Sequence, residues 1–273
     1  MKAQALITHQ GPNFVYEDVI LPDPSPKNIL VQALYSGISI GTEFAYITRK
    51  LDNGPYPLCT GYQGIGVVKH VGDKIQGFKV DDRVYYRRNQ EIQLANGQNV
   101  SVCSGVHCSY AILEPDPTHG IALLPEGIDE ETASLFVMPA VGLNGVDMAN
   151  PRMGDSVAVY GCGLIGLGVV AACSHRGCIV FAIDIQNDRL KVAQNLGADH
   201  ILNSTTGDVS ESLKKIAPEG ADVVFESTGI PTCIDPAMQL CKRHGKFVFQ
   251  GNYGKPPIST NFLLPHGKRI AAF

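Results

Sequence analysis

Three glycines that follow a short apolar run form the pattern in this sequence that most directly indicates chemistry. Residues 157–166 have the sequence V-A-V-Y-G-C-G-L-I-G, so four β-type residues lead straight into Gly161, Gly163 and Gly166. In a dinucleotide-binding turn the first glycine permits the tight turn and the second lets the backbone approach a pyrophosphate. The third lets the next helix pack closely on the strand. The pyrophosphate would lie at the positive end of that helix.

An aspartate in the expected place strengthens this interpretation. A second apolar strand is predicted over residues 179–185 and contains Asp184, about twenty residues beyond the glycines, where the fingerprint has an acceptor for ribose hydroxyls. A carboxylate there accepts from both hydroxyls of NAD and repels the 2′-phosphate of NADP, so we expect NAD as the cofactor. Arg189 is the nearby cation that could hold that phosphate, and we expect it to flank the adenine instead. An ordinary strand-to-helix turn would leave both the glycines and the acid unexplained.

The nicotinamide half of such a cofactor lies at the carboxyl ends of later strands. Thr228 and Gly229 follow the predicted fourth strand, and Gln250 and Gly251 follow the fifth, where the crevice of a parallel sheet opens. The expected cofactor-binding residues are therefore Gly161, Gly163, Leu164, Ile165, Gly166, Asp184, Ile185, Arg189, Thr228, Gly229, Gln250 and Gly251.

Length and composition limit the class of protein. A chain of 273 residues exceeds the usual size of one hydrophobic core, so we expect two domains. The net charge of −4 comes with scattered lysines and arginines, and this excludes a basic stripe for nucleic acid. No apolar stretch is long enough to span a bilayer, and the first residues do not resemble a signal peptide, so we expect a cytoplasmic protein. The eight cysteines contain no C-x-x-C pair, and we expect reduced, mostly buried thiols.

The first half of the chain has the pattern of an all-β unit. Short apolar runs at 2–8, 13–20, 29–35, 62–71, 82–86 and 106–113 are separated by glycine and proline, which predicts a small barrel. Residues 36–42 are expected to form a loop and residues 43–49 one or two helical turns. Residues 89–99 are polar and are expected to form a hairpin tip.

The pattern changes at residue 129. Residues 130–148 are expected to be helical, with breaks at Pro139 and Gly142. Strands are then predicted at 157–160, 179–185, 200–202, 222–226 and 246–250, and helices at 164–173, 188–196, 209–217 and 232–243. Such alternation predicts a parallel sheet covered on both faces. Gly177, Gly197, Gly220 and Gly245 follow helical stretches, where a left-handed cap is expected. We therefore expect an α/β protein with domains at 1–138 and 139–273.

The order of these parts resembles the medium-chain dehydrogenase/reductase superfamily, the alcohol and polyol dehydrogenases. The resemblance rests on G-V-V-K-H-V-G near residue 66, D-D-R-V at 81 and G-C-G-L-I-G at 161, and it covers essentially the whole chain. It implies a GroES-like barrel followed by a Rossmann doubly wound sheet, with the active site in the cleft between them. It also implies a final segment that returns to the barrel. The chain ends inside an apolar run at 268–273, so we expect that return segment to be missing.

The zinc-binding motifs of that family are altered here. Zinc members carry G-I-C-G-T-D and G-H-E, whereas this chain has G-I-S-I-G-T-E at 37–43 and G-Y-Q at 61–63. Ile40, or Ser39 with a one-residue shift, replaces the cysteine, and Tyr62 and Gln63 replace the histidine and the glutamate. Catalytic zinc needs three protein ligands from Cys, His, Asp or Glu, so we expect no metal site. The four-cysteine lobe of many relatives is absent as well. The S-G-I-S-x-G-T-E stretch resembles a zinc-lacking branch that includes bacteriochlorophyllide dehydrogenases, but it is too short to assign that substrate.

Three residues are the candidates for catalysis without zinc. Thr42 matches the residue that touches the substrate oxygen in relatives, and Tyr62 would project where a metal ligand normally lies. A phenol there could donate to a carbonyl oxygen, or it could be a buried aromatic that fills the vacated cavity. Glu43 could be a base or a surface-paired acid. His107 and His70 are expected to be ordinary polar barrel residues.

Two functions fit these observations. The first is an NAD-dependent oxidoreductase that transfers a hydride between nicotinamide and a secondary alcohol, a polyol or the corresponding ketone. The alternative is a dinucleotide-binding protein without turnover. We expect a small-molecule substrate, no nucleic-acid or membrane partner, and a homodimer for the full-length form.

Overall fold

The computed structural model describes residues 1–52, 54–116 and 120–273, which form two compact units, Met1–Val137 and Met138–Phe273. Each unit has its own sheets and its own buried core. No helix in these described ranges is long and apolar enough to cross a membrane.

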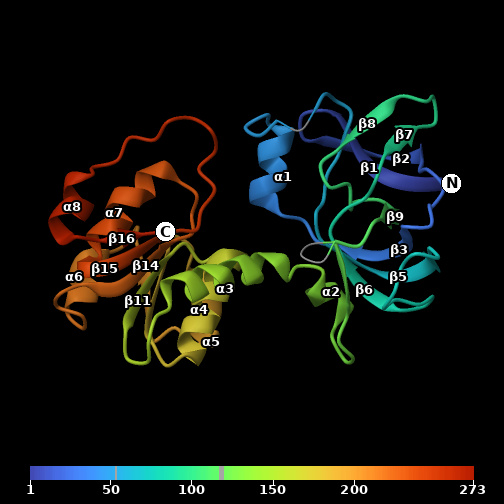
Figure 1. Cartoon of the computed structure of the whole chain (residues 1–273). Helices are drawn as coiled ribbons and strands as arrows, with labels where there is room; N and C mark the ends of the chain where they lie inside the picture. Colours follow the sequence, from blue (N-terminus) through green and yellow to red (C-terminus); the bar gives the residue numbers. More distant parts are fainter. Residues whose placement is uncertain (53, 117–119) are drawn as a thin grey trace. The chain divides into compact units, whose positions relative to one another are not determined.

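The first unit is built mainly from β-strands (Figure 1). One sheet closes into a barrel with the order β1-β2-β7-β8-β4, and a five-stranded sheet has the order β10-β6-β5-β3-β9. The strands are β1 (Lys2–Gln10), β2 (Asn13–Ile20), β3 (Ile29–Ser36), β4 (Leu58–Cys59), β5 (Gly64–Val71), β6 (Arg83–Tyr86), β7 (Ile92–Leu94), β8 (Asn99–Val102), β9 (Tyr110–Leu113) and β10 (Ile121–Leu123). The helices are α1 (Ile40–Ile47) and α2 (Glu130–Ala133).

Alternation along the strands explains the barrel core. Ala3, Ala5 and Ile7 of β1 point inward and are buried, while the residues between Ala3 and Ile7 are exposed. The glycines of β5 allow close pairing, because a Cβ at Gly66 would overlap the backbone of Gln32 on β3. The apolar runs expected at 2–8 and 13–20 form β1 and β2, which pair antiparallel, and the run expected at 62–71 contains β5.

Short strands in this unit depart from the sequence-based prediction. The polar region 89–99 contains β7, so the hairpin tip is confined to residues 95–98. The strand expected at 106–113 begins only at Tyr110, and β4 and β10 were not predicted. These strands are two to four residues long and are held by pairing with distant strands, which local sequence does not reveal.

The second unit is an α/β sandwich around a parallel sheet with the order β13-β12-β11-β14-β15-β16. This is the doubly wound Rossmann order. Its strands are β11 (Ser156–Tyr160), β12 (Ile179–Asp184), β13 (His200–Asn203), β14 (Ala221–Glu226), β15 (Cys241–Phe249) and β16 (Ala271–Ala272). Its helices are α3 (Val137–Ala149), α4 (Leu164–His175), α5 (Asn187–Asn195), α6 (Val209–Lys214), the 3₁₀ turn η1 (Pro231–Cys233), α7 (Ile234–Gln239) and α8 (Leu263–Lys268).

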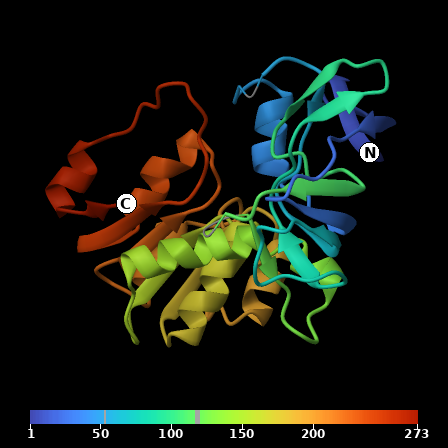
Figure 2. The ribbon, with the colours of Figure 1, turned by 45° about the vertical axis from the view of Figure 1, so that its right-hand side comes forward.

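Two helical layers cover the two faces of this sheet (Figure 2). Successive residues of β11 point to opposite faces, so Val157 and Val159 pack with α3, α4 and α5, whereas Ala158 packs with α6 and α7. Both faces are therefore apolar, as expected for a buried parallel sheet. The glycine caps predicted after helices are confirmed at Gly177, Gly197 and Gly220, which all have positive φ.

Two predictions for this unit were wrong. The expected breaks at Pro139 and Gly142 do not occur, because α3 runs through both. Pro139 lies in the first turn, where its missing N–H costs no helical hydrogen bond. Gly142 instead permits close packing, since a Cβ there would overlap the carbonyl oxygen of Ile165 on α4.

The second error concerns the helix expected at 232–243. Helix α7 ends at Gln239, and β15 begins at Cys241, where it pairs with Ala221. Gly245 consequently lies inside a strand and does not cap a helix. Pairing with a neighbouring strand has overridden the local helical preference.

Candidate functional site

The turn between β11 and α4 has the three glycine properties that a dinucleotide requires. Gly161 has a φ of 97°, in the left-handed region that favours glycine. Gly163 is the N-cap of α4, and a Cβ on it would meet nothing within 4 Å, so the backbone there is open to a ligand. A Cβ at Gly166 would overlap the carbonyl oxygen of Gly161. The residues therefore fit a pyrophosphate at the start of a twelve-residue helix.

Asp184 lies at the end of β12 beside this turn. The amide of Cys162 donates to its Oδ2 at 2.7 Å, and the amide of Gln186 donates to its Oδ1 at 2.9 Å. A carboxylate has about four acceptor positions, so roughly two remain for ribose hydroxyls. Burial and the charge of Asp184 raise the pKa of the Cys162 thiol to about 12. Arg189 Nη1 lies 3.9 Å from Asp184 Oδ2, and its side chain is half exposed.

The loops expected to face the nicotinamide are joined by a buried acid. Glu226 ends β14 and is fully buried. Its side chain accepts from the amide of Thr228 at 2.9 Å and from the hydroxyls of Thr228 and Tyr253. Its backbone carbonyl accepts from the amides of Gln250 and Gly251, each at 2.9 Å. The structure thus brings together the residues that follow β14 and β15 at one edge of the sheet.

In the first unit, α1 carries two of the expected catalytic residues. The N-cap of α1 is Ser39, and its amide donates to Glu43 Oε1 at 2.8 Å. Thr42 precedes Glu43 and is half buried, whereas Glu43 is 5 % exposed. Residues 40–42, expected in a loop, form the first turn of this helix.

Glu43 lies at the centre of a buried hydrogen-bond network. Its Oε2 accepts from the hydroxyl of Thr60 at 2.8 Å and lies 2.8 Å from His107 Nε2. The other ring nitrogen of His107 lies 2.9 Å from the hydroxyl of Ser36. Burial acts to raise the pKa of Glu43. His107, the Ser39 amide and the Thr60 hydroxyl act to lower it, and the net pKa is below its ordinary value. We infer that Glu43 is held as a structural anion within the unit.

The same network reaches the segment that carries Tyr62. Thr60 is two residues before Tyr62, and Gly61 packs directly on His107, since a Cβ at Gly61 would lie 2.9 Å from that ring. The Tyr62 ring is half buried against an apolar cluster that includes Ile65, and the Arg87 guanidinium lies 5.6 Å from its centroid. No hydrogen bond to the Tyr62 hydroxyl is formed by the residues that the structure describes. The phenol is therefore free to donate to a ligand.

The residues at the family's zinc positions do not fit a metal ion. Ile40 is 77 % exposed, and the buried amide of Gln63 has no hydrogen-bond partner within the described part of the chain. Within residues 1–52, 54–116 and 120–273, no three His, Cys, Asp or Glu side chains gather closely enough to hold a metal. His70 is exposed on β5.

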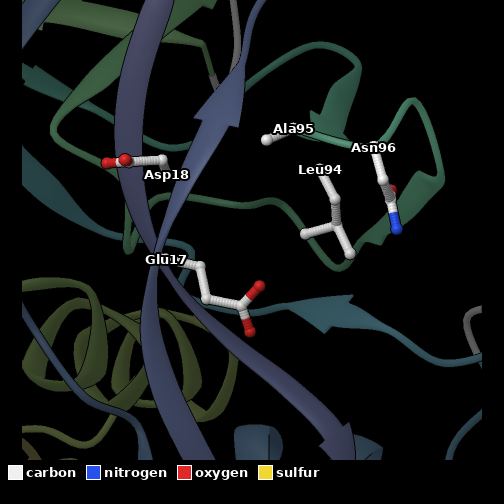
Figure 3. A pocket seen from close by; sticks show the side chains of 5 residues that line it. All are labelled: Glu17, Asp18, Leu94, Ala95 and Asn96. Atoms are coloured by element: carbon white, nitrogen blue, oxygen red, sulfur yellow. The ribbon is translucent and has the colours of Figure 1, made fainter.

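Two surface hollows of the first unit lie away from these residues. One, of about 300 Å³, is formed by Glu17 and Asp18 on β2 and by Leu94, the last residue of β7, with Ala95 and Asn96 after it. Figure 3 shows Glu17 and Asp18 pointing to opposite sides of their strand. The other, of about 520 Å³, lies next to Arg49 and Asp52 after α1. Neither hollow contains Thr42, Glu43 or Tyr62.

Together the barrel, the Rossmann sheet and the glycine turn define a two-domain protein of the dinucleotide-binding dehydrogenase class. A family model described as a zinc-binding dehydrogenase matches residues 165–273, and one described as an alcohol dehydrogenase GroES-like domain matches residues 25–125. The chain therefore belongs to the medium-chain dehydrogenase/reductase superfamily of zinc-type alcohol dehydrogenase-like proteins.

Known proteins of this kind align over nearly the whole chain. Sorbitol dehydrogenase from Bacillus subtilis (strain 168) is 25 % identical over 95 % of this chain and 78 % of its own length. Benzyl alcohol dehydrogenase from Acinetobacter calcoaceticus superposes with a TM-score of 0.86 at 19 % identity, over 100 % of this chain and 83 % of the other. A zinc-binding dehydrogenase from Sinorhizobium meliloti 1021 bound to NADP superposes with a TM-score of 0.85 at 21 % identity. The match covers 100 % of this chain and 83 % of the other. Both of these solved structures have the same fold as this chain.

Sequence reasoning missed Glu226, Tyr253 and the role of His107. Glu226 had a usable signal, because an acid that ends an apolar strand is the same feature that identified Asp184. Tyr253 and His107 had none, since each meets its acid only through tertiary folding.

Proposed function

We propose that this protein is an NAD-dependent oxidoreductase that acts on a secondary alcohol, a polyol or the corresponding ketone without a catalytic zinc ion. The observation that carries the proposal is the open backbone at Gly163, at the N-terminus of α4 and beside Asp184. Sorbitol dehydrogenase among the relatives supports an alcohol or polyol as substrate.

The cofactor would supply or accept the hydride, and the chain would bind it and handle one proton. The glycine turn would hold the pyrophosphate, and the unused acceptor positions of Asp184 would hold the ribose hydroxyls. Ile185 and Arg189 would flank the adenosine half, and the residues after β14 and β15 would line the nicotinamide half.

Thr42 and Tyr62 are the residues we propose for the substrate oxygen. Their segments are joined through Glu43 and Thr60, so one buried network supports both hydroxyls. The free phenol of Tyr62 would donate a hydrogen bond to the oxygen on which negative charge develops. Glu43 has both carboxylate oxygens engaged, and this favours a supporting role over contact with substrate.

The alternative is a dinucleotide-binding protein without turnover. It is favoured by the residues at the zinc positions, which leave no metal ligand set in the described ranges. Turnover distinguishes the two functions, because both require cofactor binding.

A fluorescence titration with NADH and NADPH, followed by a panel of polyols, secondary alcohols and ketones, tests the proposal. We expect tighter NADH binding and turnover of at least one substrate class. Equal or tighter NADPH binding would refute the NAD assignment, and tight binding with no turnover would favour the alternative. Elemental analysis with and without chelator tests the metal: stoichiometric zinc, with activity lost on chelation, would contradict a zinc-independent reaction. Cytoplasmic location and a homodimer stay predictions, and light scattering tests the dimer.

A further inference from the structure

Glu226 occupies a distinctive place in the Rossmann sheet. It is the last residue of β14 and pairs with Tyr160, the last residue of β11 before the glycine turn. The order of the sheet reverses between these two strands, and ligands of such sheets bind at that point. Glu226 is also fully buried.

The carboxylate of Glu226 has only neutral donors around it. They are the amide and hydroxyl of Thr228 and the hydroxyl of Tyr253. No Lys or Arg side chain of the described residues forms an ion pair with it. Asp222, at the other end of the same strand, is paired with Lys242. One acid of β14 is therefore neutralised by a cation and the other is not.

Burial and the negative charge of Glu226 together raise the pKa values of two neighbouring side chains. Burial raises the pKa of Tyr253, and the hydrogen bond and charge of Glu226 raise it further. Burial raises the pKa of Cys233 as well, and the charge of Glu226 adds to it. A buried carboxylate without a cation is costly unless other groups compensate its charge. A cationic ligand group in the crevice would provide that compensation.

We propose that Glu226 makes this crevice favour the oxidised, cationic nicotinamide ring over the reduced, neutral one. The inference rests on the proposed function, in which the loops after β14 and β15 line the nicotinamide half. The two forms of the cofactor share the adenosine, the pyrophosphate and both riboses, so those groups contribute almost equally to both affinities. Only the ring differs in charge, and the charge of Glu226 acts on that difference.

Glu226→Gln tests this with little change in shape. The Gln oxygen can accept from Thr228 and its amide can donate to the Tyr253 oxygen, so the loop contacts are kept while the charge is removed. We expect the ratio Kd(NAD⁺)/Kd(NADH) to rise roughly five- to tenfold, as for loss of a unit charge at moderate distance in a partly screened site. Calorimetry measures the Kd of NAD⁺, and a fluorescence titration measures the Kd of NADH. Glu219→Gln, an exposed acid before β14, is the matched control and should leave the ratio unchanged.

A second pair of variants covers the case in which Glu226→Gln does not fold. Tyr253→Phe keeps the carboxylate, whereas the double variant Glu226→Met with Tyr253→Phe removes the acid together with the phenol that it would leave unpaired. The ratio should rise only in the double variant. Normal binding of both forms with an unchanged ratio in the variants that lack Glu226 would overturn the inference and leave the proposed function intact. Failure of the unmutated protein to bind either form would refute the proposed function and this inference with it.

Discussion

Glu43 Oε2 lies 2.8 Å from His107 Nε2, although the two residues are 64 positions apart in the chain. The pair fastens the start of α1 to the segment between β8 and β9. Thr60, just beyond β4, donates to the same carboxylate oxygen. Three separate parts of the first unit thus converge on one buried acid, and these parts adjoin Thr42 and Tyr62.

Glu43 should make the stability of the protein depend on acid pH. Its pKa in the folded state is below its ordinary value of about 4.5, so the unfolded chain binds more protons between these two values. Stability from Glu43 is therefore fully present above about pH 4.5 and lost as pH falls through the folded pKa. Glu43→Gln should lower the free energy of unfolding at pH 7 by about 1–3 kcal/mol and reduce the loss of stability as the pH falls below about 4.5. Urea unfolding at several pH values measures both effects, with the exposed Glu126→Gln as control. If Glu43→Gln lost stability at acid pH as steeply as the unmutated protein, another group would be responsible for that pH dependence.

Tyr62 should contribute to turnover and not to cofactor binding. Tyr62→Phe keeps the ring against its apolar cluster and removes only the hydroxyl. We expect kcat to fall about a hundredfold, as for loss of one preorganised donor, with NADH affinity nearly unchanged. Tyr16→Phe, at an exposed site on β2, is the matched control. Full turnover in Tyr62→Phe would mean that Tyr62 only packs, and that the proton travels through Thr42 or bound water.

Asp184 should set the choice between the two nicotinamide cofactors. Asp184→Asn can keep one backbone hydrogen bond, but it loses the charge that repels a 2′-phosphate. We expect the affinity for NADH to fall about tenfold and the affinity for NADPH to rise relative to that for NADH. Asp199→Asn is a close control, because Asp199 also accepts from an amide of β12, at Val180 near the opposite end of the strand. Unchanged discrimination in Asp184→Asn would show that the ribose acceptor lies elsewhere.

The eight thiols should differ sharply in reactivity. Seven are buried, and burial raises the pKa of Cys173 and Cys241 to about 12. Cys233 is the partly exposed one, although burial and the charge of Glu226 raise its pKa too. Iodoacetamide at pH 8 should modify Cys233 slowly and the other seven hardly at all, because the thiolate is the reactive form. Mass spectrometry after treatment of the folded protein counts the alkylated cysteines. Rapid modification of a second thiol would contradict this burial pattern.

The features that were predicted correctly are those encoded locally. The backbone of the glycine turn, the place of Asp184 at the end of β12 and the caps at Gly177 and Gly197 each depend on backbone conformation within a few residues. The fold class follows from the alternation of strands and helices, which is also a local property. The expected domain division, the catalytic residues and the cofactor-binding residues stay predictions.

The features that were missed depend on contacts between distant segments. Gly142 appeared to end a helix, but it serves the packing of α3 on α4. Cys241 appeared helical, but its strand is completed by β14. The partners of Glu226 and Glu43 lie up to 27 and 64 positions away, so no sequence window contains both members of either pair.

The hydrogen bond from the Cys162 amide to Asp184 has a consequence for how the cofactor enters. This carboxylate fastens the glycine turn to β12, and two backbone amides use about half of its acceptor positions. The turn is thus ordered without ligand, and in the proposed function binding of the adenosine half would require little further ordering of the backbone. Fragments such as ADP or ADP-ribose should therefore retain a large share of the binding free energy of the whole dinucleotide. The nicotinamide half would then bind after the adenosine half is already held by the turn.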